Sequence, residues 1–394
     1  MVDGISMLNW ISKSPATLVF SMSICLLASG VPAQESGFMS KAPDEPAAPL
    51  CRVLLTLKPN EGTPRHSEGD LLRRGDGALL AVWTRFTSGT GGDHDPADLV
   101  ASVSADGGVT WSRPRVVVPS EGGMNVMSVT LRRLADGRIA LFHLIKHSLV
   151  NCRPVVRFSS DEGATWSEPT EIVPPEDVGY DVLNNDRVYI DETGRMLVPV
   201  ARHAGSGMTP RFSAAARLRC YVSEDHGATW NSGGWAPEVS GVVLQEPGIF
   251  QAADGTLRMH ARTNGGCHYI ASSGDRGRTF SRPRPWTLRS PMSPATVERL
   301  DDGDLLALWN EPASDVKAAS SPRTPLVAAR SSDDGATWGA RSVLFDHPDG
   351  WYCYVAHLPS EAGMYLMTCA GDRSNGNGLE TTVVLEAPLP PRDP

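Results

Sequence analysis

The chain has 394 residues, with 45 acidic against 36 basic side chains and a formal net charge of −9. No basic tract interrupts this balance, which argues against a nucleic-acid partner. Its 38 glycines and 31 prolines, set among an ordinary share of apolar residues, are typical of a globular β protein rich in turns.

The first 33 residues are predicted to be a signal peptide. Lys13 precedes an apolar run over 16–30, and small residues at 31–33 offer a cleavage site before Gln34. A membrane anchor is the alternative, but the run is shorter than the roughly 18 residues that a span needs. We therefore expect a secreted or periplasmic protein with no membrane span in the mature chain. Residues 34–48, rich in Pro, Ser and Ala, are predicted to be a linker.

An eight-residue phrase of the form S-x-D-x-G-x-T-(W/F) organises the rest of the chain. It occurs five times, starting at Ser104, Ser159, Ser223, Ser273 and Ser331. Its Asp can accept hydrogen bonds from a turn backbone and its Gly can adopt positive φ, so each copy is predicted to be a structural turn between two strands. A phrase repeated at such intervals indicates a repeat architecture.

A second repeat alternates with the first. Aliphatic runs flank six acidic or Gly-containing turns, which are centred at Asp76, Asp136, Gly194, Asp254, Asp302 and Gly363. Each is a β-hairpin signal, and a hairpin, a strand, the phrase and a further strand make one four-stranded blade. Six hairpins thus predict an all-β fold, a six-bladed β-propeller catalytic domain over residues 49–390. Residues 51–57 are predicted to complete the last blade as its outer strand, beside 380–387, and to close the ring.

Cysteine usage leaves two readings open. Cys25 leaves with the signal peptide, and the other six cysteines could form disulfides in an oxidising compartment or remain as buried thiols. No zinc spacing, Gly-rich phosphate loop or Ser-His-Asp signature occurs, so we expect neither a metal nor a cofactor.

The propeller prediction also indicates where a site would lie. The central strands of all blades converge at one mouth, so polar residues beside their ends are expected to line one pocket. We assign substrate binding there to Asn125, Asn185, Asp186 and Arg187.

The repeated phrase resembles the Asp-box of the sialidase (neuraminidase) superfamily, and the likeness covers nearly the whole mature chain. Glu246 stands sixteen residues before Arg262, and Arg323 stands eight before Ser331, as in sialidases. Tyr352 in GWYCYVAHL matches the tyrosine that opens the last blade, and Asp93 in GGDHDPADLV lies in the first blade's loop. The resemblance implies a retaining exo-α-sialidase-like glycoside hydrolase that removes terminal sialic acid from a glycan or glycoconjugate.

The residue types suit that chemistry. Arginines such as Arg262 and Arg323 would grip the sugar carboxylate in bidentate fashion. A neutral Tyr352 avoids the repulsion that a carboxylate nucleophile would meet, and sialidases are the tyrosine exception among glycosidases. Glu246 would take the proton of the tyrosine. Asp93 would be the general acid, which requires a raised pKa.

Each assignment has an alternative. Glu246 and Arg262 could form a structural ion pair, and Arg323 could be a solvated loop arginine. Tyr352 could belong to the core, with Tyr354 turned outward instead. Asp93 competes with Asp95 and Asp98 for the acid role, and this cluster could instead hold a cation.

One departure from the family concerns the first arginine. The Arg-Ile-Pro motif that opens sialidases is absent near Ser67, where Arg65 lies two residues upstream and could fill the place. Glu68 could occupy it instead, and it would repel a sialic acid carboxylate. The alternatives are therefore a same-fold exo-glycosidase acting on another terminal sugar, or a non-catalytic glycan-binding propeller.

Overall fold

A computed structural model describes residues 51–392, apart from 205–212, 315–316 and 377. The predicted signal peptide (1–33) and linker (34–48) lie outside the described residues. The chain divides into two units, Met1–Ala48 and Pro49–Pro394, and every described residue belongs to the second.

The described residues form strands joined by turns, and the predicted all-β class is confirmed. They include two 3₁₀ helices, η1 (Pro175–Asp177) and η2 (Ala318–Ser320). No helix in this part of the chain is long and apolar enough to cross a membrane.

Antiparallel four-stranded sheets account for most of the chain. The first contains β2 (Arg65–Arg73), β3 (Leu79–Phe86), β4 (Ala97–Ser104) and β5 (Arg115–Val118). Two more contain β15 (Leu244–Gln251), β16 (Leu257–Thr263), β17 (Cys267–Ser273) and β18 (Arg284–Arg289), then β19 (Thr296–Arg299), β20 (Leu305–Asn310), β21 (Leu326–Ser331) and β22 (Ser342–Phe345).

The region between β5 and β15 forms a nine-stranded sheet. Its strands are β6 (Asn125–Arg133), β7 (Ile139–Ser148), β8 (Asn151–Ser159), β9 (Thr170–Glu171), β10 (Tyr180–Val182), β11 (Tyr189–Ile190), β12 (Met196–His203), β13 (Ala216–Ser223) and β14 (Asn231–Ser232). A single parallel pairing, Tyr180 with Cys152, joins β10 to β8 and so links two antiparallel groups. Six separate blades are therefore not what the strand pairing gives, and the six-bladed ring stays a prediction.

The last sheet combines the two ends of the described chain. It contains β23 (Gly350–Ser360), β24 (Gly363–Asp372), β25 (Thr382–Ala387) and β1 (Arg52–Leu57). Strand β1 pairs antiparallel with β25, from Arg52 opposite Glu386 to Leu57 opposite Thr382. The predicted outer position of residues 51–57 in the last sheet is thereby confirmed.

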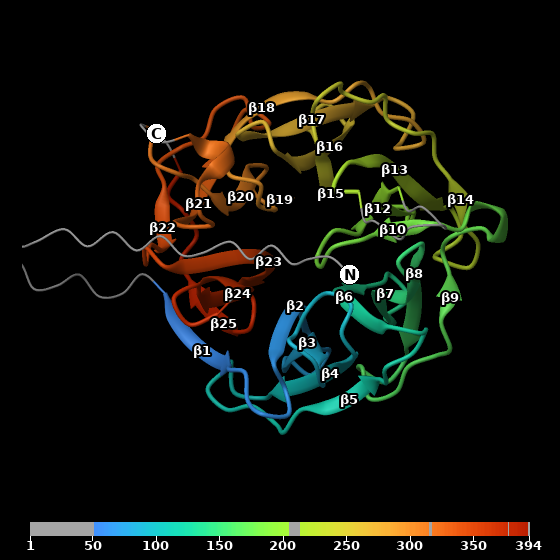
Figure 1. The fold of residues 1–394 in the computed structure, drawn as a ribbon, viewed down its shortest axis with the longest axis vertical. Helices are drawn as coiled ribbons and strands as arrows, with labels where there is room; N and C mark the ends of the chain where they lie inside the picture. Colours follow the sequence, from blue (N-terminus) through green and yellow to red (C-terminus); the bar gives the residue numbers. More distant parts are fainter. Residues whose placement is uncertain (1–50, 205–212, 315–316, 377, 393–394) are drawn as a thin grey trace, which may run out of the picture. The chain divides into compact units, whose positions relative to one another are not determined.

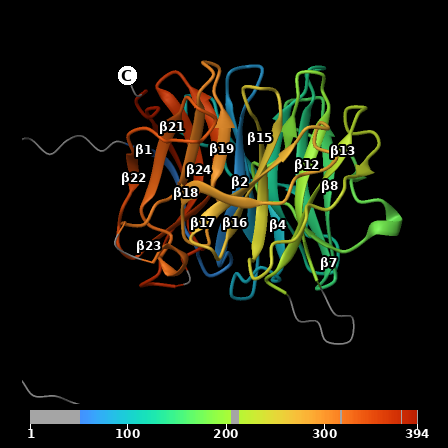
Figure 2. The same ribbon diagram turned by 90° about the horizontal axis from the view of Figure 1, so that it is seen from above.

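The sheets lie around a common axis within this unit, with β2, β6, β15, β19 and β23 nearest to it (Figure 1). Turned by 90°, the same strands run through the depth of the unit (Figure 2). The apolar core fills the spaces between neighbouring sheets, as where Leu80 and Val82 of β3 pack with Val129 and Leu131 of β6. Another cluster packs Trp83 of β3 against Met367 of β24, so the last sheet contacts the first.

The turns behave as the sequence predicts. In the first hairpin, Asp76 Oδ1 accepts the Ala78 N–H at 3.1 Å and Gly77 has φ +85°. In the first copy of the eight-residue phrase, Asp106 accepts both the backbone N–H of Thr110, at 2.8 Å, and its hydroxyl. The other four copies repeat these two bonds. The phrase aspartates are therefore committed to their own turns.

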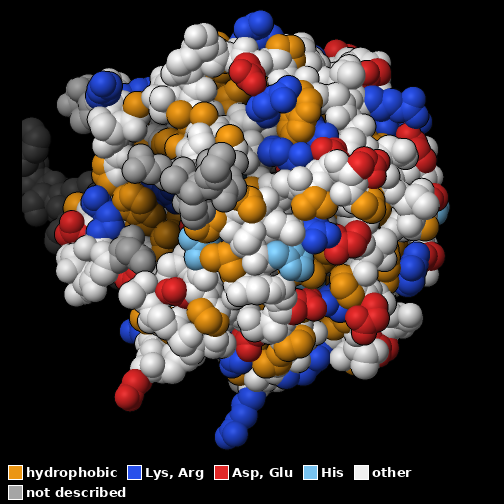
Figure 3. Space-filling view, turned by 45° about the vertical axis from the view of Figure 1, so that its right-hand side comes forward, with side chains coloured by type: hydrophobic (Ala, Val, Ile, Leu, Met, Phe, Trp, Pro, Cys, Tyr) orange, Lys and Arg blue, Asp and Glu red, His pale blue; other side chains and the backbone are white. Residues whose placement is uncertain are grey.

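Acidic and basic side chains lie interspersed on the face shown in Figure 3, without a single-sign field. None of the six cysteines in the described part of the chain is in a disulfide; four are buried thiols, and Cys51 and Cys267 are partly exposed.

Candidate active site

Four inner strands each carry the same irregularity near their start. In β2, β6, β15 and β23 one extra residue opposes the partner strand, between Ser67 and Asp70 in β2 and at the matching places in the others. A β-bulge of this kind re-aims a side chain. The bulged residues with positive φ are Glu68 (46°), Ser128 (64°), Glu246 (50°) and Tyr354 (58°). Positive φ is costly for residues other than glycine and is often found at functional sites.

All four bulged side chains line one cavity of about 220 Å³. Its other walls come from the loop before β4, the nine-stranded sheet and β16, and include Asp93, His94, Lys146, Asn184, His203 and Arg262. Larger cavities exist elsewhere, of about 480 and 840 Å³. The smaller one is the candidate active site because it gathers three carboxyl groups, two tyrosines (Tyr180 and Tyr354) and several cationic side chains.

Tyr354 lines the cavity beside Glu246. Its hydroxyl donates to Glu246 Oε1 at 3.3 Å, and the Arg323 guanidinium lies 5.6 Å from its ring centroid. Burial, followed by the charge of Glu246, raises the pKa of Tyr354 well above its usual value, although Arg262 and Arg323 oppose the shift. A phenol in this state needs a base, and Glu246 is within hydrogen-bond reach.

Tyr352, the predicted nucleophile, is not among the residues that line this cavity. Its ring stacks on Phe345, with centroids 4.8 Å apart and planes 12° from parallel, inside an apolar cluster. Alternation along a regular strand would turn residues 352 and 354 to the same side. The bulge between Cys353 and Ala356, with positive φ at Tyr354, breaks that alternation and sends the two rings to different surroundings.

Glu246 and Arg262 come together as the sequence predicts. Arg262 Nε lies 2.9 Å from Glu246 Oε2, and Arg262 Nη2 donates to Gln245 Oε1 at 2.7 Å. Both residues line the cavity, so an ion pair and a role in the site coexist here.

Asp93 faces the cavity but is bound to an arginine. Arg65 Nη1 donates to Asp93 Oδ1 at 2.6 Å, and the Asp93 carbonyl accepts bonds from Lys146 Nζ at 2.8 Å and Asn125 Nδ2 at 3.1 Å. Desolvation raises the pKa of Asp93, but the charges of Arg65 and Lys146 outweigh it and bring the pKa to about 2. The raised pKa expected for a general acid is therefore not found at Asp93.

Glu68 occupies the wall beside Asp93. Its Oε2 accepts a bond from the Ser128 hydroxyl, and its Oε1 lies 3.4 Å from Arg65 Nη2. Desolvation raises the pKa of Glu68 to about 7, even though Arg65 acts in the opposite direction.

The three arginines do not share one cavity. Arg262 lines it, whereas Arg65 is buried and holds Asp93, Ser67, Glu68 and the Gly91 carbonyl. Arg323 donates to the Met292 carbonyl at 3.3 Å and lies over Trp351 at 5.0 Å, so it is no solvated loop arginine. The structure therefore does not bring the predicted trio together around one space, because Arg65 is bound to the carboxyl groups of Asp93 and Glu68.

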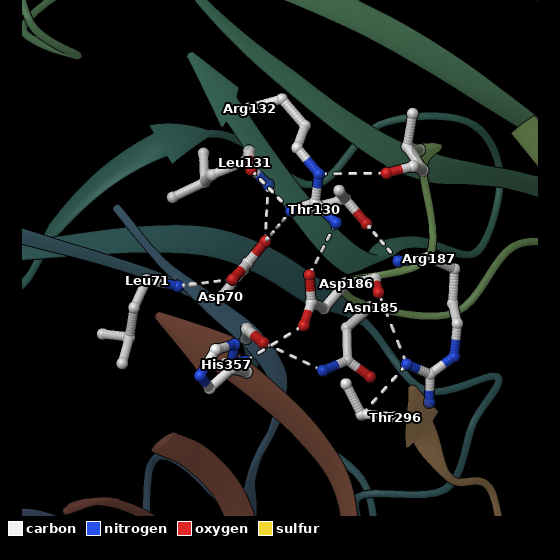
Figure 4. Close-up of polar contacts among 12 residues, drawn as sticks. Asp70, Leu71, Thr130, Leu131, Arg132, Asn185, Asp186, Arg187, Thr296 and His357 are labelled. Carbon is white, nitrogen blue, oxygen red and sulfur yellow. Dashed lines mark hydrogen bonds and ion pairs between the residues drawn. The ribbon is translucent and has the colours of Figure 1, made fainter. Parts of the chain in front are cut away.

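Four predicted substrate-binding residues have structural partners instead. Asn125 Nδ2 holds the Asp93 and Asp95 carbonyls, and Asn185 Nδ2 donates to the carbonyls of Gly69 and Tyr354. Asp186 and Arg187 belong to a buried network with Asp70, Arg132, Thr296 and His357 (Figure 4). Asp186 and Arg187 line the separate 480 Å³ cavity, so the structure does not bring these two residues together with the candidate site.

The acidic cluster near Asp93 is also partnered. Asp95 Oδ2 accepts the N–H groups of Thr90 and Gly92, and Asp98 pairs with Arg85 at 2.7 Å. Within the described ranges, no group of three or more His, Cys, Asp or Glu side chains is placed to hold a metal ion.

His94, Lys146 and His203 follow the second strands of their hairpins, where pocket residues are expected, and they line the cavity, whereas Ser128 lines it from outside those expected positions. A signal for Ser128 and Tyr354 did exist. Apart from the phrase residues Glu162, His226, Arg276 and Asp334, the non-glycine residues with positive φ lie at 68, 128, 186, 246 and 354, at intervals near the period of the repeated phrase or twice that period.

The fold is sialidase-like. The structure is similar to a protein of unknown function from Dyadobacter fermentans, with a TM-score of 0.66 and 18% identity over 86% of this chain and 100% of that one. It is equally similar to the leech intramolecular trans-sialidase solved with 2,7-anhydro-Neu5Ac, with a TM-score of 0.66 and 15% identity over 87% of this chain and 70% of that one. At these identities the likeness concerns the fold.

Sequence comparison gives the family. Residues 77–367 match the BNR repeat-like domain, and the chain belongs to that family. A stretch of 136 residues is 28% identical to the anhydrosialidase of Macrobdella decora, covering 32% of this chain but only 16% of that protein's length. The chain is therefore a sialidase-like BNR-repeat protein, as the repeated phrase predicts.

Proposed function

We propose that the protein is a retaining exo-glycosidase, secreted or periplasmic, which uses Tyr354 to release a terminal sugar from glycans on a six-bladed propeller. The observation that carries this proposal is the hydrogen bond from Tyr354 to Glu246 inside a cavity also lined by Arg262, Asp93 and Glu68. Nucleophile, base and carboxyl acid thereby face one small space. The anhydrosialidase relative supports the glycosidase class.

In the first step Glu246 takes the phenolic proton of Tyr354, whose oxygen attacks the anomeric carbon. The glycosidic C–O bond breaks, and the leaving oxygen receives a proton from a carboxyl group on the wall formed by Glu68 and Asp93. In the second step that carboxylate takes a proton from water. The water oxygen then displaces Tyr354, which regains its proton from Glu246, and the configuration is retained.

Terminal sialic acid is the substrate that the family resemblance suggests. The commitment of Arg65 to Asp93 and Glu68, and the presence of Glu68 in the cavity, favour a second candidate, a terminal sugar without a carboxylate at the anomeric carbon. Arg262 alone would be a weak carboxylate grip beside three acidic side chains.

A hydrolysis panel tests the proposal. The purified protein is incubated with a 4-methylumbelliferyl sialoside and with 4-methylumbelliferyl glycosides of neutral hexoses, deoxyhexoses and pentoses, and product configuration is followed by proton NMR. Turnover with retention, and labelling of the Tyr354 peptide by the matching fluorosugar, are expected. Tight glycan binding on an array without turnover would instead establish a lectin.

A further inference from the structure

Glu68 occupies the same position in its strand as Tyr354, the proposed nucleophile, and Glu246, the proposed base. It lies on the bulge of β2, as Glu246 lies on the bulge of β15 and Tyr354 on that of β23, and all three have positive φ. Backbone strain of this kind persists where the surrounding structure holds it, and it gathers at active sites. The side chain of Glu68 is thus aimed into the cavity by the same device that aims the nucleophile and its base.

Glu68 and Asp93 share one counter-ion. Arg65 Nη1 lies 2.6 Å from Asp93 Oδ1, and Arg65 Nη2 lies 3.4 Å from Glu68 Oε1. One guanidinium cannot neutralise two carboxylates, and the shorter contact goes to Asp93. The Asp93 side chain is also 60% exposed, whereas that of Glu68 is 4% exposed. The proton of this pair therefore belongs on Glu68, since burial penalises its charged form.

Arg65 is the cation that acts most strongly on Glu68, whereas Lys146 and Arg262, which line the same cavity, contact the Asp93 carbonyl and Glu246. The groups that face it are Arg65 on its own strand, Asp93 from the loop before β4, Ser128 on β6 and Glu246 on β15. The Cys369 thiol of β24 contacts the neighbouring Ser67 hydroxyl at 3.4 Å. Two of these neighbours are carboxylates that add to the effect of burial, and the pKa of Glu68 is about 7 while that of Asp93 is about 2. When the pKa values of two neighbouring carboxyl groups differ this much, the one with the higher pKa can serve as the acid while the other stays ionised.

We propose that Glu68 is the general acid of the glycosidase reaction, with Asp93 as the permanently ionised counter-ion of Arg65. This inference rests on the proposed function. The Glu68 O–H bond breaks as its proton passes to the glycosidic oxygen and the C–O bond opens. The resulting carboxylate recovers a proton from the incoming water.

Leaving-group dependence tests the role. For the sugar that the wild-type protein hydrolyses, rates are compared for a 2,4-dinitrophenyl glycoside, whose leaving group needs no proton, and a methyl glycoside, whose leaving group does. In kcat/KM, which reports cleavage of the glycosidic bond and not the second step, Glu68→Gln is expected to lose about 10²–10⁴-fold on the methyl glycoside and less than about tenfold on the dinitrophenyl glycoside. Asp93→Asn, changed on the other arm of Arg65, is the matched control. Selective loss on the methyl glycoside in Asp93→Asn, and not in Glu68→Gln, would overturn the inference.

A pH profile adds a readout that a structural role would not move. The basic limb of kcat/KM should disappear in Glu68→Gln. It should move to higher pH in Ser128→Gly, because the Ser128 hydroxyl lowers the pKa of Glu68 and glycine accepts the positive φ at that position. An unmoved basic limb in both variants would contradict the assignment.

Titration without substrate separates the inference from the function. Carbon-13 NMR of glutamate-labelled protein, wild type against Glu68→Gln, should show one carboxyl group that titrates near neutral pH. Hydrolysis by a protein whose Glu68 ionises below about pH 5 would overturn only the inference, since the reference pKa is about 4.3. Failure to hydrolyse any glycoside would overturn the proposed function, and the catalytic role of Glu68 with it.

Discussion

The Tyr354 hydroxyl lies 3.3 Å from Glu246 Oε1, although the two residues are 108 positions apart in the chain and come from β23 and β15. Both have left-handed backbone, at φ 58° and 50°. The contact is therefore made by two bulged inner strands on different sheets, so no local sequence motif could predict it.

Exchange of either tyrosine for phenylalanine removes one hydroxyl, but only one exchange should affect catalysis. Tyr354→Phe should lower kcat by at least about 10²-fold, because the nucleophilic oxygen is lost. Tyr352→Phe should retain nearly full activity, because its ring stacks on Phe345 away from the cavity. Initial rates on the same substrate compare the two, and loss of activity in Tyr352→Phe alone would restore the original assignment.

Asn185 should act as a positioning residue. Its amide nitrogen donates to the Gly69 carbonyl at 3.0 Å and to the Tyr354 carbonyl at 2.9 Å, so it ties the bulge of β2 to that of β23. Asn185→Asp keeps the shape and loses both donors. We expect kcat to fall about 10- to 100-fold, with KM little changed, because a small displacement of the nucleophile is costly. A 10- to 100-fold rise in KM with kcat unchanged would contradict this role.

The free energy of unfolding should depend on pH through Glu68. Its pKa is 4.5 in the unfolded reference and about 7 in the folded protein, so the folded state binds more protons between these values. Stability therefore falls as pH rises from 4.5 to 7 and is level above, by up to about 3 kcal/mol. Urea unfolding of wild type and Glu68→Gln at pH 4.5 and pH 8 measures the difference. An unchanged gap between them at the two pH values would exclude the shift.

Removing one partner of the Glu246–Arg262 ion pair should lower the free energy of unfolding more than removing both. The side chains are 8% and 12% exposed, and removal of one charge leaves the other buried. Arg262→Met should cost about 3 kcal/mol or more of stability, and the added change Glu246→Gln should restore part of it. A double-mutant cycle by urea unfolding measures the coupling. Additive losses would show that the two side chains do not interact.

The phrase aspartates should matter for stability and not for turnover. Asp333 accepts the Thr337 N–H at 2.9 Å and the Thr337 hydroxyl at 2.6 Å. Asp333→Ala should lower the free energy of unfolding by about 1–2 kcal/mol, because the hydrogen bonds of the turn are lost, and should leave kcat unchanged. Glu361→Ala, at an exposed position in the β23–β24 turn, is the control. A fall in kcat for Asp333→Ala at full folding would assign the phrase a catalytic role.

Much of the fold follows from the sequence because its determinants are local. Each hairpin turn carries its own Asp or Gly, and each phrase carries the acceptor, the glycine and the threonine that form its turn. The apolar run at 51–57 has no partner strand near it in the sequence, which predicts that it pairs with residues 380–387 in the last sheet, and β1 indeed pairs with β25. The merged nine-stranded sheet was not foreseeable, because it depends on the one parallel pairing between Tyr180 and Cys152.

The site is harder to predict from the sequence than the fold, because no single residue type marks the positions with left-handed backbone. Glu, Ser, Asp and Tyr all adopt it, and only the near-regular spacing of residues 68, 128, 186 and 246 betrays it. Motif matching therefore selected Tyr352, two residues out of phase with that spacing. Arg65 illustrates a second difficulty, since its type suits a substrate carboxylate while its contacts satisfy Asp93 and Glu68.

The pairing of β1 with β25 also sets an order of events during synthesis. The segment Arg52–Leu57 leaves the ribosome more than 300 residues before its partner Thr382–Ala387 exists. A contact so distant along the chain forms slowly, and until it does both strands present open edges. We therefore expect the final sheet to be the last to assemble, and a chain that ends before β25 to expose its first strand to other molecules and to aggregate.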